Sequence, residues 1–215
     1  MFAGPFEESM IKRAQDKGIV EIKIHDLRQW ASDERSTVDD KPYGGGPGMV
    51  MMVEPIDRAL RELQATRYKQ QAKILLTPQG KTFNQQKARE LSKLDRLILI
   101  AGHYEGFDER IRQLTDEEIY IGDYVLTGGE LPAMVVVDAV VRLIPGVLGK
   151  EASLDEESFS PSTGSGLEYP QYTRPENFQG MKVPDILLSG HHAAIAKWRQ
   201  NQAAKRTRER RPDLI

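Results

Sequence analysis

The sequence predicts an α/β fold with a largely parallel sheet, and three observations support this. The apolar runs at 73–76 (KILL), 96–102 (RLILIAG) and 124–129 (YVLTGG) have the composition of buried strands. Each run ends in glycine or proline and precedes a plausible helix, and such alternation is typical of parallel sheets. The 215 residues, 39% hydrophobic and 29% charged, suffice for one full core and a small second module.

The remaining elements follow from local patterns. Residues 20–27 (VEIKIHDL) alternate apolar and polar side chains, which predicts another strand. The segment 121–132 (IGDYVLTGGELP) predicts a strand, a tight turn and a helix, because adjacent glycines cannot continue a strand and proline suits the first turn of a helix. That helix is expected to run to about Leu143, before Pro145.

The composition changes after this helix. Residues 158–170 (SFSPSTGSGLEYP) are rich in serine, glycine and proline, which is typical of a linker or a mobile loop. A short module over 171–215 follows and contains a predicted helix near His192 to Arg210. We therefore expect a small, mainly helical C-terminal domain.

Targeting and redox signals are weak in this sequence. The N-terminus lacks a basic segment followed by an apolar run, and charged residues interrupt the longest apolar stretch, 133–144. The chain has no cysteine, which excludes disulfides, zinc–thiolate sites and thiol nucleophiles. We expect a soluble, cytoplasmic protein without a membrane partner.

The charge is asymmetric although the formal net charge is only −2. Residues 197–211 carry seven basic side chains and one acidic one, which fits either a solvated helix face or a phosphate-binding surface. An acidic cluster, Glu151 with 155–157, precedes the Ser/Gly/Pro-rich stretch and fits a solvated helix start.

Three glycine-bearing loops follow the predicted strands, at 75–80, 101–106 and 125–132. In an open α/β sheet such strand ends gather at one edge, where ligands bind. The loops therefore predict a small-molecule pocket with close backbone contacts. The patterns GxGxxG and GxxxxGK[ST] are absent, and GGGPG at 44–48 matches neither, which disfavours a Rossmann or P-loop enzyme.

Six segments together resemble one known family. They are PYGGGPGM (42–49), GHYEGFDER (102–110), IGDYVLTGGELPA (121–133), PGVLG (145–149), YTRPE (172–176) and SGHH with KWR (189–199). They are similar to TrmD, the bacterial tRNA guanine-N1 methyltransferases of the SPOUT class. The resemblance implies S-adenosyl-L-methionine-dependent methylation of guanosine N1 immediately 3′ of the anticodon, at tRNA position 37.

The resemblance also implies an architecture. It gives a SPOUT domain over 1–157 with a deep trefoil knot, a flexible linker over 158–170 and a C-terminal tRNA-binding domain over 171–215. Two such chains form a homodimer. Topology rules alone would not predict a knot, because true knots are nearly absent from proteins.

The resemblance also assigns individual residues of this sequence to the cofactor. Backbone groups of these loops would read the adenine, and the glycines would let it approach. Tyr104 taken alone also fits an ordinary core or rim aromatic. The residues that the resemblance places around S-adenosyl-L-methionine are Leu75, Leu76, Thr77, Pro78, Gly102, Tyr104, Glu105, Ile121, Gly122, Tyr124, Leu126, Gly128, Gly129 and Pro132.

Two residues are catalytic candidates. Arg142 lies four residues after Asp138, which fits an intrahelical ion pair; the resemblance makes it the cation that stabilises charge on guanine O6. Glu157 stands where the family carries aspartate, so the resemblance makes it the general base for N1–H. Asp155 and Glu156 are rival bases.

Further residues are assigned to tRNA by the resemblance. Gly46 and Gly48, which also fit a flexible loop, would leave room for a flipped base. The other expected contacts are Arg174, His191, His192, Lys197, Arg199 and Arg208. The paired histidines lack a third ligand at metal-binding spacing, so no metal residue is assigned. Magnesium is associated with the family's catalysis, but the sequence offers no dedicated site, and DNA is not an expected partner.

Two other functions compete with the methyltransferase. One is a non-catalytic RNA-binding protein, and the other is an enzyme that uses an adenosine cofactor on a small molecule. Arg142, an acid near 157 and intact cofactor loops favour the methyltransferase over the first, and the basic tail argues against the second. The family's opening strand and distal C-terminal segment are not in this sequence, and we expect either loss to cost stability or tRNA affinity.

Overall fold

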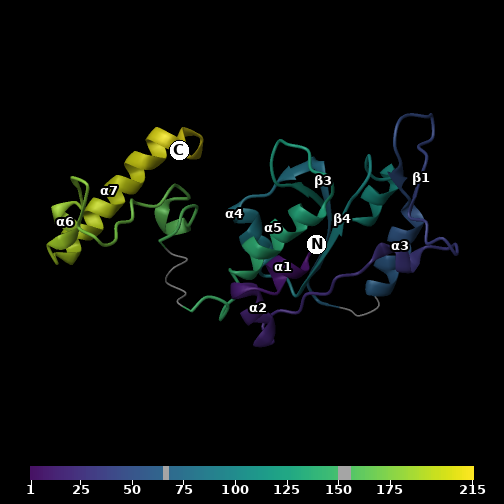
Figure 1. The fold of residues 1–215 in the computed structure, drawn as a ribbon, viewed down its shortest axis with the longest axis horizontal. Coiled ribbons are helices and arrows are strands. Elements are labelled where there is room, and N and C mark those ends of the chain that lie inside the picture. Colours follow the sequence, from purple (N-terminus) through teal and green to yellow (C-terminus); the bar gives the residue numbers. More distant parts are fainter. Residues whose placement is uncertain (65–67, 150–155) are drawn as a thin grey trace. The chain divides into compact units, whose positions relative to one another are not determined.

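The computed structural model describes residues 1–64, 68–149 and 156–215. They divide into two compact units, Met1–Gly149 and Lys150–Ile215, which we call the sheet unit and the helical unit. Figure 1 draws both, and each is described by itself. The domain boundaries and the flexible linker inferred from the sequence stay predictions.

Three parallel strands form the centre of the sheet unit. β3 (Gln71–Thr82) lies between β4 (Arg96–Ala101) and β5 (Glu117–Tyr120). Ile74, Leu75 and Leu76 are almost fully buried because β3 has a neighbour on both sides. The α/β class with a parallel sheet is confirmed, as are strands at 73–76 and 96–101.

Helices cover both faces of this sheet (Figure 1). Successive side chains of a strand point to opposite faces. Ile74 and Leu76 accordingly pack in one cluster with α4 (Gln85–Leu91) and α5 (Glu130–Val141), whereas Leu75 packs in another with α3 (Val53–Leu63) and the 3-10 helix η2 (Glu109–Leu114). The predicted helix after Gly129 is α5, so that prediction is confirmed.

The N-terminal helices cover a second side of α5. Phe6 of α1 (Ala3–Phe6) and Ile11 of α2 (Ser9–Asp16) lie in one cluster with Met134 and Val141. A 3-10 helix, η1 (Leu27–Trp30), and a short antiparallel pair, β1 (Asp39–Asp40) with β2 (Val50–Met51), complete the described elements of the unit.

Two predicted strands are wrong. Residues 20–26 form no ladder with any described strand, and without a partner the alternating pattern cannot become a strand; 27–30 are η1. Residues 124–129 form bends and irregular chain instead of a strand. The third strand is β5. The sequence analysis did not predict it, because β5 begins with two glutamates. Lys87 pairs with Glu117 at 3.1 Å, and Arg112 pairs with Glu118.

The helical unit is built around α7 (His192–Arg210), which confirms the helix predicted there. The Ala194 N–H donates to His191 Nδ1 at 3.2 Å and caps its first turn. The other elements are a 3-10 turn η4 (Pro161–Thr163), the hairpin β6 (Asn177–Phe178) with β7 (Met181–Lys182), α6 (Asp185–Leu188) and η5 (Pro212–Leu214). No helix among the described residues is long and apolar enough to cross a membrane.

Candidate active site

The strand registers bring three glycine-bearing loops to one edge of the sheet. Leu76 of β3 is level with Ala101 of β4 and with Ile119 of β5. Because the strands are parallel, the segments that follow them emerge on the same side. This confirms that the bulged segment 77–80 within β3 and the loops at 102–106 and 121–129 share an edge, although the last of these follows β5 rather than the strand predicted at 124–129.

Two of these loops touch through their backbones. The Gly129 N–H donates to the Gly102 carbonyl at 2.7 Å. A Cβ on Gly129 would lie 2.6 Å from the Gly102 nitrogen and 2.7 Å from the Ala101 Cα, which no real side chain tolerates. The second glycine of the pair is therefore needed because the loops pack backbone to backbone.

Gly128 has a different neighbour. A Cβ there would lie 2.2 Å from Glu130 Oε2 and 2.8 Å from His103 Nδ1. His103 Nδ1 is 3.7 Å from Glu130 Oε1, so these two side chains bridge the same loops that Gly129 and Gly102 join. Neither His103 nor Glu130 was a candidate from the sequence, since a histidine and a glutamate 27 positions apart form no recognisable motif.

The glycine-rich loop at 44–48 meets the second loop. A Cβ on Gly48 would lie 2.4 Å from the Glu105 Cγ, and Gly48 has a φ of +74°. The Glu105 N–H donates to the Met49 carbonyl at 3.0 Å, and the Met51 N–H donates to the Gly106 carbonyl at 2.9 Å. The structure thus joins a loop expected beside the target base to a loop expected around the cofactor.

Tyr104 has an unusual backbone. Its φ is +62°, in the left-handed region that few non-glycine residues occupy, and its side chain is 41% exposed. A hydrogen bond with Asp39 raises the pKa of Tyr104. The tyrosine is a rim side chain tied to β1 rather than a core aromatic.

The end of β3 supplies a bulge. Its pairing with β5 shifts between Leu76 and Lys81, so the intervening residues leave the ladder. Thr77 is buried and its hydroxyl accepts from the Gln79 N–H at 3.4 Å, whereas Pro78 is exposed. A Cβ on Gly80 would lie 2.5 Å from the Glu118 backbone, so this loop too packs closely on its neighbour.

The segment after β5 leaves apolar side chains uncovered. Tyr124 is 56% exposed, Val125 88% and Leu126 36%. A Cβ on Gly122 would lie 2.4 Å from the Tyr124 ring, so this glycine makes space for the ring. Ile121 is half-buried, and Pro132 lies in the first turn of α5 as predicted. Contiguous uncovered apolar groups are typical of surfaces that a ligand or partner covers.

The two catalytic candidates lie in different units. Arg142 is half-buried at the C-terminal end of α5, where its N–H donates to the Asp138 carbonyl at 3.4 Å. Glu157 lies in the helical unit, half-buried, and its carbonyl accepts from the Ser160 N–H at 3.2 Å. Of the rival bases, Asp155 lies outside the described residues.

Glu156, the other rival, has partners of its own. Its carboxylate accepts a hydrogen bond from the Tyr169 hydroxyl and lies 3.8 Å from the Arg199 guanidinium. The same guanidinium lies 4.5 Å from the centre of the Tyr169 ring. Burial, followed by the hydrogen bond with Glu156, raises the pKa of Tyr169. Glu156 is thus held by a cation and a phenol within its own unit, which suits a structural carboxylate.

The stretch 156–169 is attached to α7 at further points. The Leu167 N–H donates to the Thr207 hydroxyl at 2.9 Å, and Thr207 is buried. Arg211 lies 5.8 Å from the centre of the Phe159 ring. Ser160 is completely buried, and the Phe159 N–H donates to the Gly166 carbonyl at 2.7 Å. This segment, which carries Glu157, is therefore packed on α7.

The residues expected to contact tRNA are mostly accessible. Gly46 and Gly48 are exposed in the sheet unit. In the helical unit Arg174, His191, His192, Lys197 and Arg208 are exposed, whereas Arg199 is half-buried beside Tyr169. The structure places five of these basic or histidine side chains on α7 or at its cap, and only Arg174 of this set lies elsewhere. No cluster of three or more metal-ligating side chains occurs in the part of the chain that the structure describes.

Comparison with known proteins gives a consistent result. The sequence profile of the family described as "tRNA (Guanine-1)-methyltransferase TrmD" matches residues 1–215. A tRNA (guanine-N(1)-)-methyltransferase of Dictyoglomus turgidum is 59% identical over 215 residues, which are 100% of this chain and 85% of that protein. The proteins of the same name from Chloroflexus aggregans and Geobacillus kaustophilus are 58% and 57% identical over 216 residues, 83% and 87% of their lengths.

Proposed function

The chain belongs to the TrmD family of tRNA (guanine-1)-methyltransferases, and on that premise we propose that it methylates N1 of the guanosine at position 37 of tRNA. The methyl donor is S-adenosyl-L-methionine. The observation that carries this proposal is a family match over the whole chain combined with three glycine-bearing loops at one sheet edge. The cytoplasm, where tRNA is modified, is the proposed location.

The loops fit the proposed cofactor. Gly102 and Gly129 let two loops pack backbone to backbone at this edge, so peptide groups of both loops lie close together, and adenine recognition needs such backbone donors and acceptors. Half-exposed Tyr104 and Leu126 offer apolar surface next to them. When bound, S-adenosyl-L-methionine supplies an electrophilic methyl group. Those loops would hold it, within the trefoil knot typical of the family.

Two side chains are proposed to act on the guanine, one as the base and one as a cation. Guanine N1 keeps its proton near neutral pH, so it needs a base and a way to stabilise the charge that develops on O6. Glu157 accepts the N1 proton, and the Arg142 guanidinium neutralises the charge on O6. S-adenosyl-L-methionine, held by the glycine-bearing loops, would supply its methyl group to N1 and would leave as S-adenosylhomocysteine. We assign no residue to magnesium.

The direct test uses two tRNA transcripts that differ only at position 37. Labelled methyl from S-adenosyl-L-methionine should enter the transcript with G at that position, and nuclease digestion should release N1-methylguanosine. The transcript with A at that position is the control and should stay unlabelled. Equal labelling of both transcripts, or of neither, contradicts the proposal.

A homodimer is the proposed assembly. Helix α5 is apolar around its circumference, with Asp138 as its one charged residue after the first turn. One side of the helix packs in the core. Leu131 and Val135, elsewhere on the same helix, are 47% and 46% exposed. A helix that is apolar all round is normally covered on every side. A second copy of the chain would cover the side that carries Leu131 and Val135.

Mixed dimers test whether two chains share a site. A chain with Arg142→Ala and a chain with Glu157→Ala are each expected to be inactive alone. If each site combines Arg142 of one chain with Glu157 of the other, random mixing restores about a quarter of the parental activity, because half of the dimers then have one intact site of two. No recovery on mixing would show that both residues act within one chain. A fully active monomer would exclude the dimer.

A further inference from the structure

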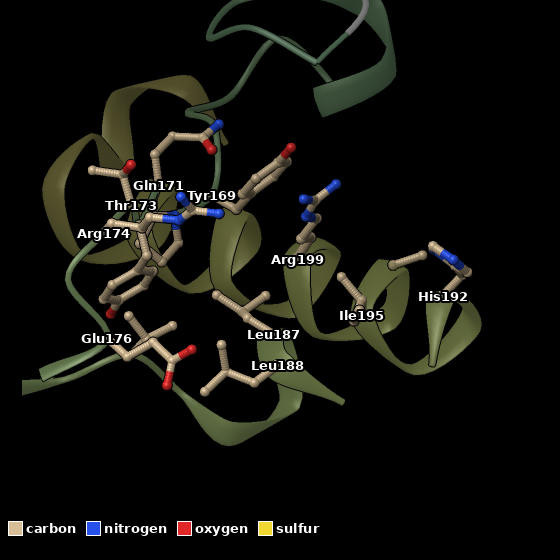
Figure 2. A pocket seen from close by; sticks show the side chains of 14 residues that line it. Tyr169, Gln171, Thr173, Arg174, Glu176, Leu187, Leu188, His192, Ile195 and Arg199 are labelled. Atoms are coloured by element: carbon tan, nitrogen blue, oxygen red, sulfur yellow. The ribbon is translucent and has the colours of Figure 1, made fainter. Parts of the chain in front are cut away.

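The helical unit contains a cavity of about 500 Å³ that none of the steps above uses. It lies between the extended segment 169–176 and the helices α6 and α7, as Figure 2 shows. Small-molecule sites in proteins commonly span about 300–1,000 Å³, so a mononucleotide fits. A second cavity of about 280 Å³ adjoins it and shares Tyr172 and Arg174.

The walls of the cavity are apolar and aromatic. Leu187 and Leu188 of α6 and Ile195 of α7 lie close together in Figure 2. Leu188 is 51% exposed and Tyr172 on the opposite segment is 49% exposed. Tyr172 and the two leucines line the same cavity, and an exposed aromatic ring together with apolar side chains is the kind of surface on which an unpaired nucleobase stacks.

The polar groups of the cavity are unevenly arranged. Figure 2 shows the guanidinium groups of Arg174 and Arg199 on the side of Tyr169, with the carboxylate of Glu176 apart from them. Arg174 is exposed and forms no ion pair with the described residues. The Nε of Arg199 is buried and has no hydrogen-bond partner among them. The cavity can therefore accept an anionic group at one end and an amine at the other.

The charge around the cavity selects the class of ligand. Helix α7 contributes Arg199 to the cavity and carries six lysine or arginine residues and one glutamate along its whole length. A surface of this sign attracts polyphosphate chains, and stacking slots beside cationic surfaces are typical of single-stranded RNA sites. A planar ring and a phosphate are both present in a nucleotide.

We propose that this cavity binds the base of an unpaired tRNA nucleotide other than the methylated guanosine. The base stacks beside Tyr172 against the leucine side chains, Arg174 binds its phosphate, and Glu176 accepts a hydrogen bond from an exocyclic amine. This inference rests on the proposed function, because it takes tRNA as the substrate. It adds a second point at which the enzyme grips an unpaired nucleotide.

The first test uses free nucleotides as probes. The full-length protein is saturated with S-adenosylhomocysteine, so that the cofactor site is occupied, and titrated with AMP, GMP, CMP and UMP at millimolar concentration. Amide resonances of Tyr172, Leu188 and Ile195 should shift with at least one of them and not with inorganic phosphate. An equal response to phosphate alone, or no response to any nucleotide, overturns the base site and leaves the cavity to a protein contact or to none.

The second test separates stacking from charge. A stacked base is worth about 1–3 kcal/mol, so Tyr172→Ala should weaken tRNA binding about 5- to 100-fold, with an unchanged dependence on salt. Tyr172→Phe keeps the ring and should bind tRNA as the parent does. The double change Lys205→Ala and Arg208→Ala removes phosphate contacts and should instead flatten the salt slope by roughly one to two units.

The outcomes distinguish this inference from the proposed function. Methyl transfer by the parent protein is measured with the same tRNA. If the parent methylates tRNA and Tyr172→Ala binds it with parental affinity, the base site is wrong and the enzyme assignment stands. If the parent does not methylate tRNA, the enzyme assignment falls, and the nucleotide titration still decides whether the cavity binds a base.

Discussion

The two units hold their functional segments by different means. In the sheet unit, the loops at 102–106 and 121–129 meet through backbone atoms at Gly102 and Gly129. In the helical unit, the segment 156–169 is fixed to α7 by side chains, with Tyr169 on Arg199 and Leu167 on Thr207. Backbone contact at a glycine accepts no substitution, whereas a side-chain contact accepts a conservative one. The two segments should therefore respond differently to small changes.

The largest expected effect separates two neighbouring glutamates. Glu157→Gln removes the base, and positioned bases typically contribute about 100-fold to 10,000-fold. The single-turnover rate should fall by that order while the affinity for S-adenosyl-L-methionine, measured by calorimetry, stays near the parental value. Glu157→Asp keeps a carboxylate and should lose far less.

Glu156→Gln is the matched control, because its partners are Tyr169 and Arg199. It should retain most of the single-turnover rate. If the Glu156 change abolishes turnover and the Glu157 change does not, then the base is Glu156 and the family alignment of this segment is displaced by one residue.

The next effect concerns the glycine contact. Gly129→Ala adds a Cβ 2.6 Å from the Gly102 nitrogen, so the two loops must separate. We expect cofactor affinity to fall at least tenfold and the free energy of unfolding to drop by about 1–3 kcal/mol, as for overpacked sites generally.

Gly4→Ala in α1 is the control, since a Cβ there meets nothing within 4 Å. It should leave cofactor affinity unchanged in the same calorimetric titration. Parental affinity in Gly129→Ala would mean that the close approach of the loops is not needed for the cofactor.

A smaller effect is expected where a side chain provides the attachment. Thr207→Val keeps the shape of the side chain but leaves the Leu167 N–H without its acceptor, which costs about 1–3 kcal/mol for a buried donor. Hydrogen exchange at the Leu167 amide should accelerate, and kcat should fall while tRNA affinity is kept.

Thr207→Ser restores the hydroxyl and should return both the exchange rate and kcat toward the parental values. Should kcat stay parental in Thr207→Val while the amide exchanges faster, then this anchor holds the segment but does not position the base.

The smallest effect is a pH dependence in the sheet unit. Asp108 follows the 102–106 loop and accepts from the Arg110 side chain at 2.8 and 2.6 Å, which lowers the pKa of Asp108. Because the folded-state pKa lies below the unfolded value, this stabilisation is complete above about pH 5 and disappears as the pH falls through the folded pKa.

The measurement is the free energy of unfolding at pH 7 and at pH 3 for the parent and for Asp108→Asn. At neutral pH the two proteins should differ by less than about 1 kcal/mol, as expected for an accessible ion pair, and at acidic pH the difference should shrink. A difference that grows on acidification would contradict the assigned ion pair.

Sequence patterns predicted those strands whose own residues indicate burial, without help from other elements. The runs at 73–76 and 96–101 are strands because apolar composition matches their burial on both faces. β5 escaped prediction because its glutamates are neutralised by Lys87 and Arg112 from other elements. Residues 20–27 show the converse, since their alternation needs a neighbouring strand that the described residues do not provide.

In the candidate site, too, the features that local sequence indicates were predicted, and those that depend on distant partners were not. The glycine-bearing loops could be found from the sequence, because glycines after apolar runs mark close backbone approach. The bridge between His103 and Glu130, and the contacts of Glu156 with Tyr169 and Arg199, join residues distant in sequence and depend on the folded chain. The serine- and glycine-rich composition of 158–170 does not reveal the hydrogen bonds through which Ser160 and Thr207 are buried.

The spacing of the anchors on α7 has a consequence for insertions and deletions. Arg199 and Thr207 are eight residues apart, about 12 Å along a helix, so the segment they hold can neither slide nor pivot without losing one of them. Adding or removing one residue between them would rotate one anchor by about 100° relative to the other. Exposed positions of α7 can therefore vary in residue type, but the helical phase between Arg199 and Thr207 is fixed.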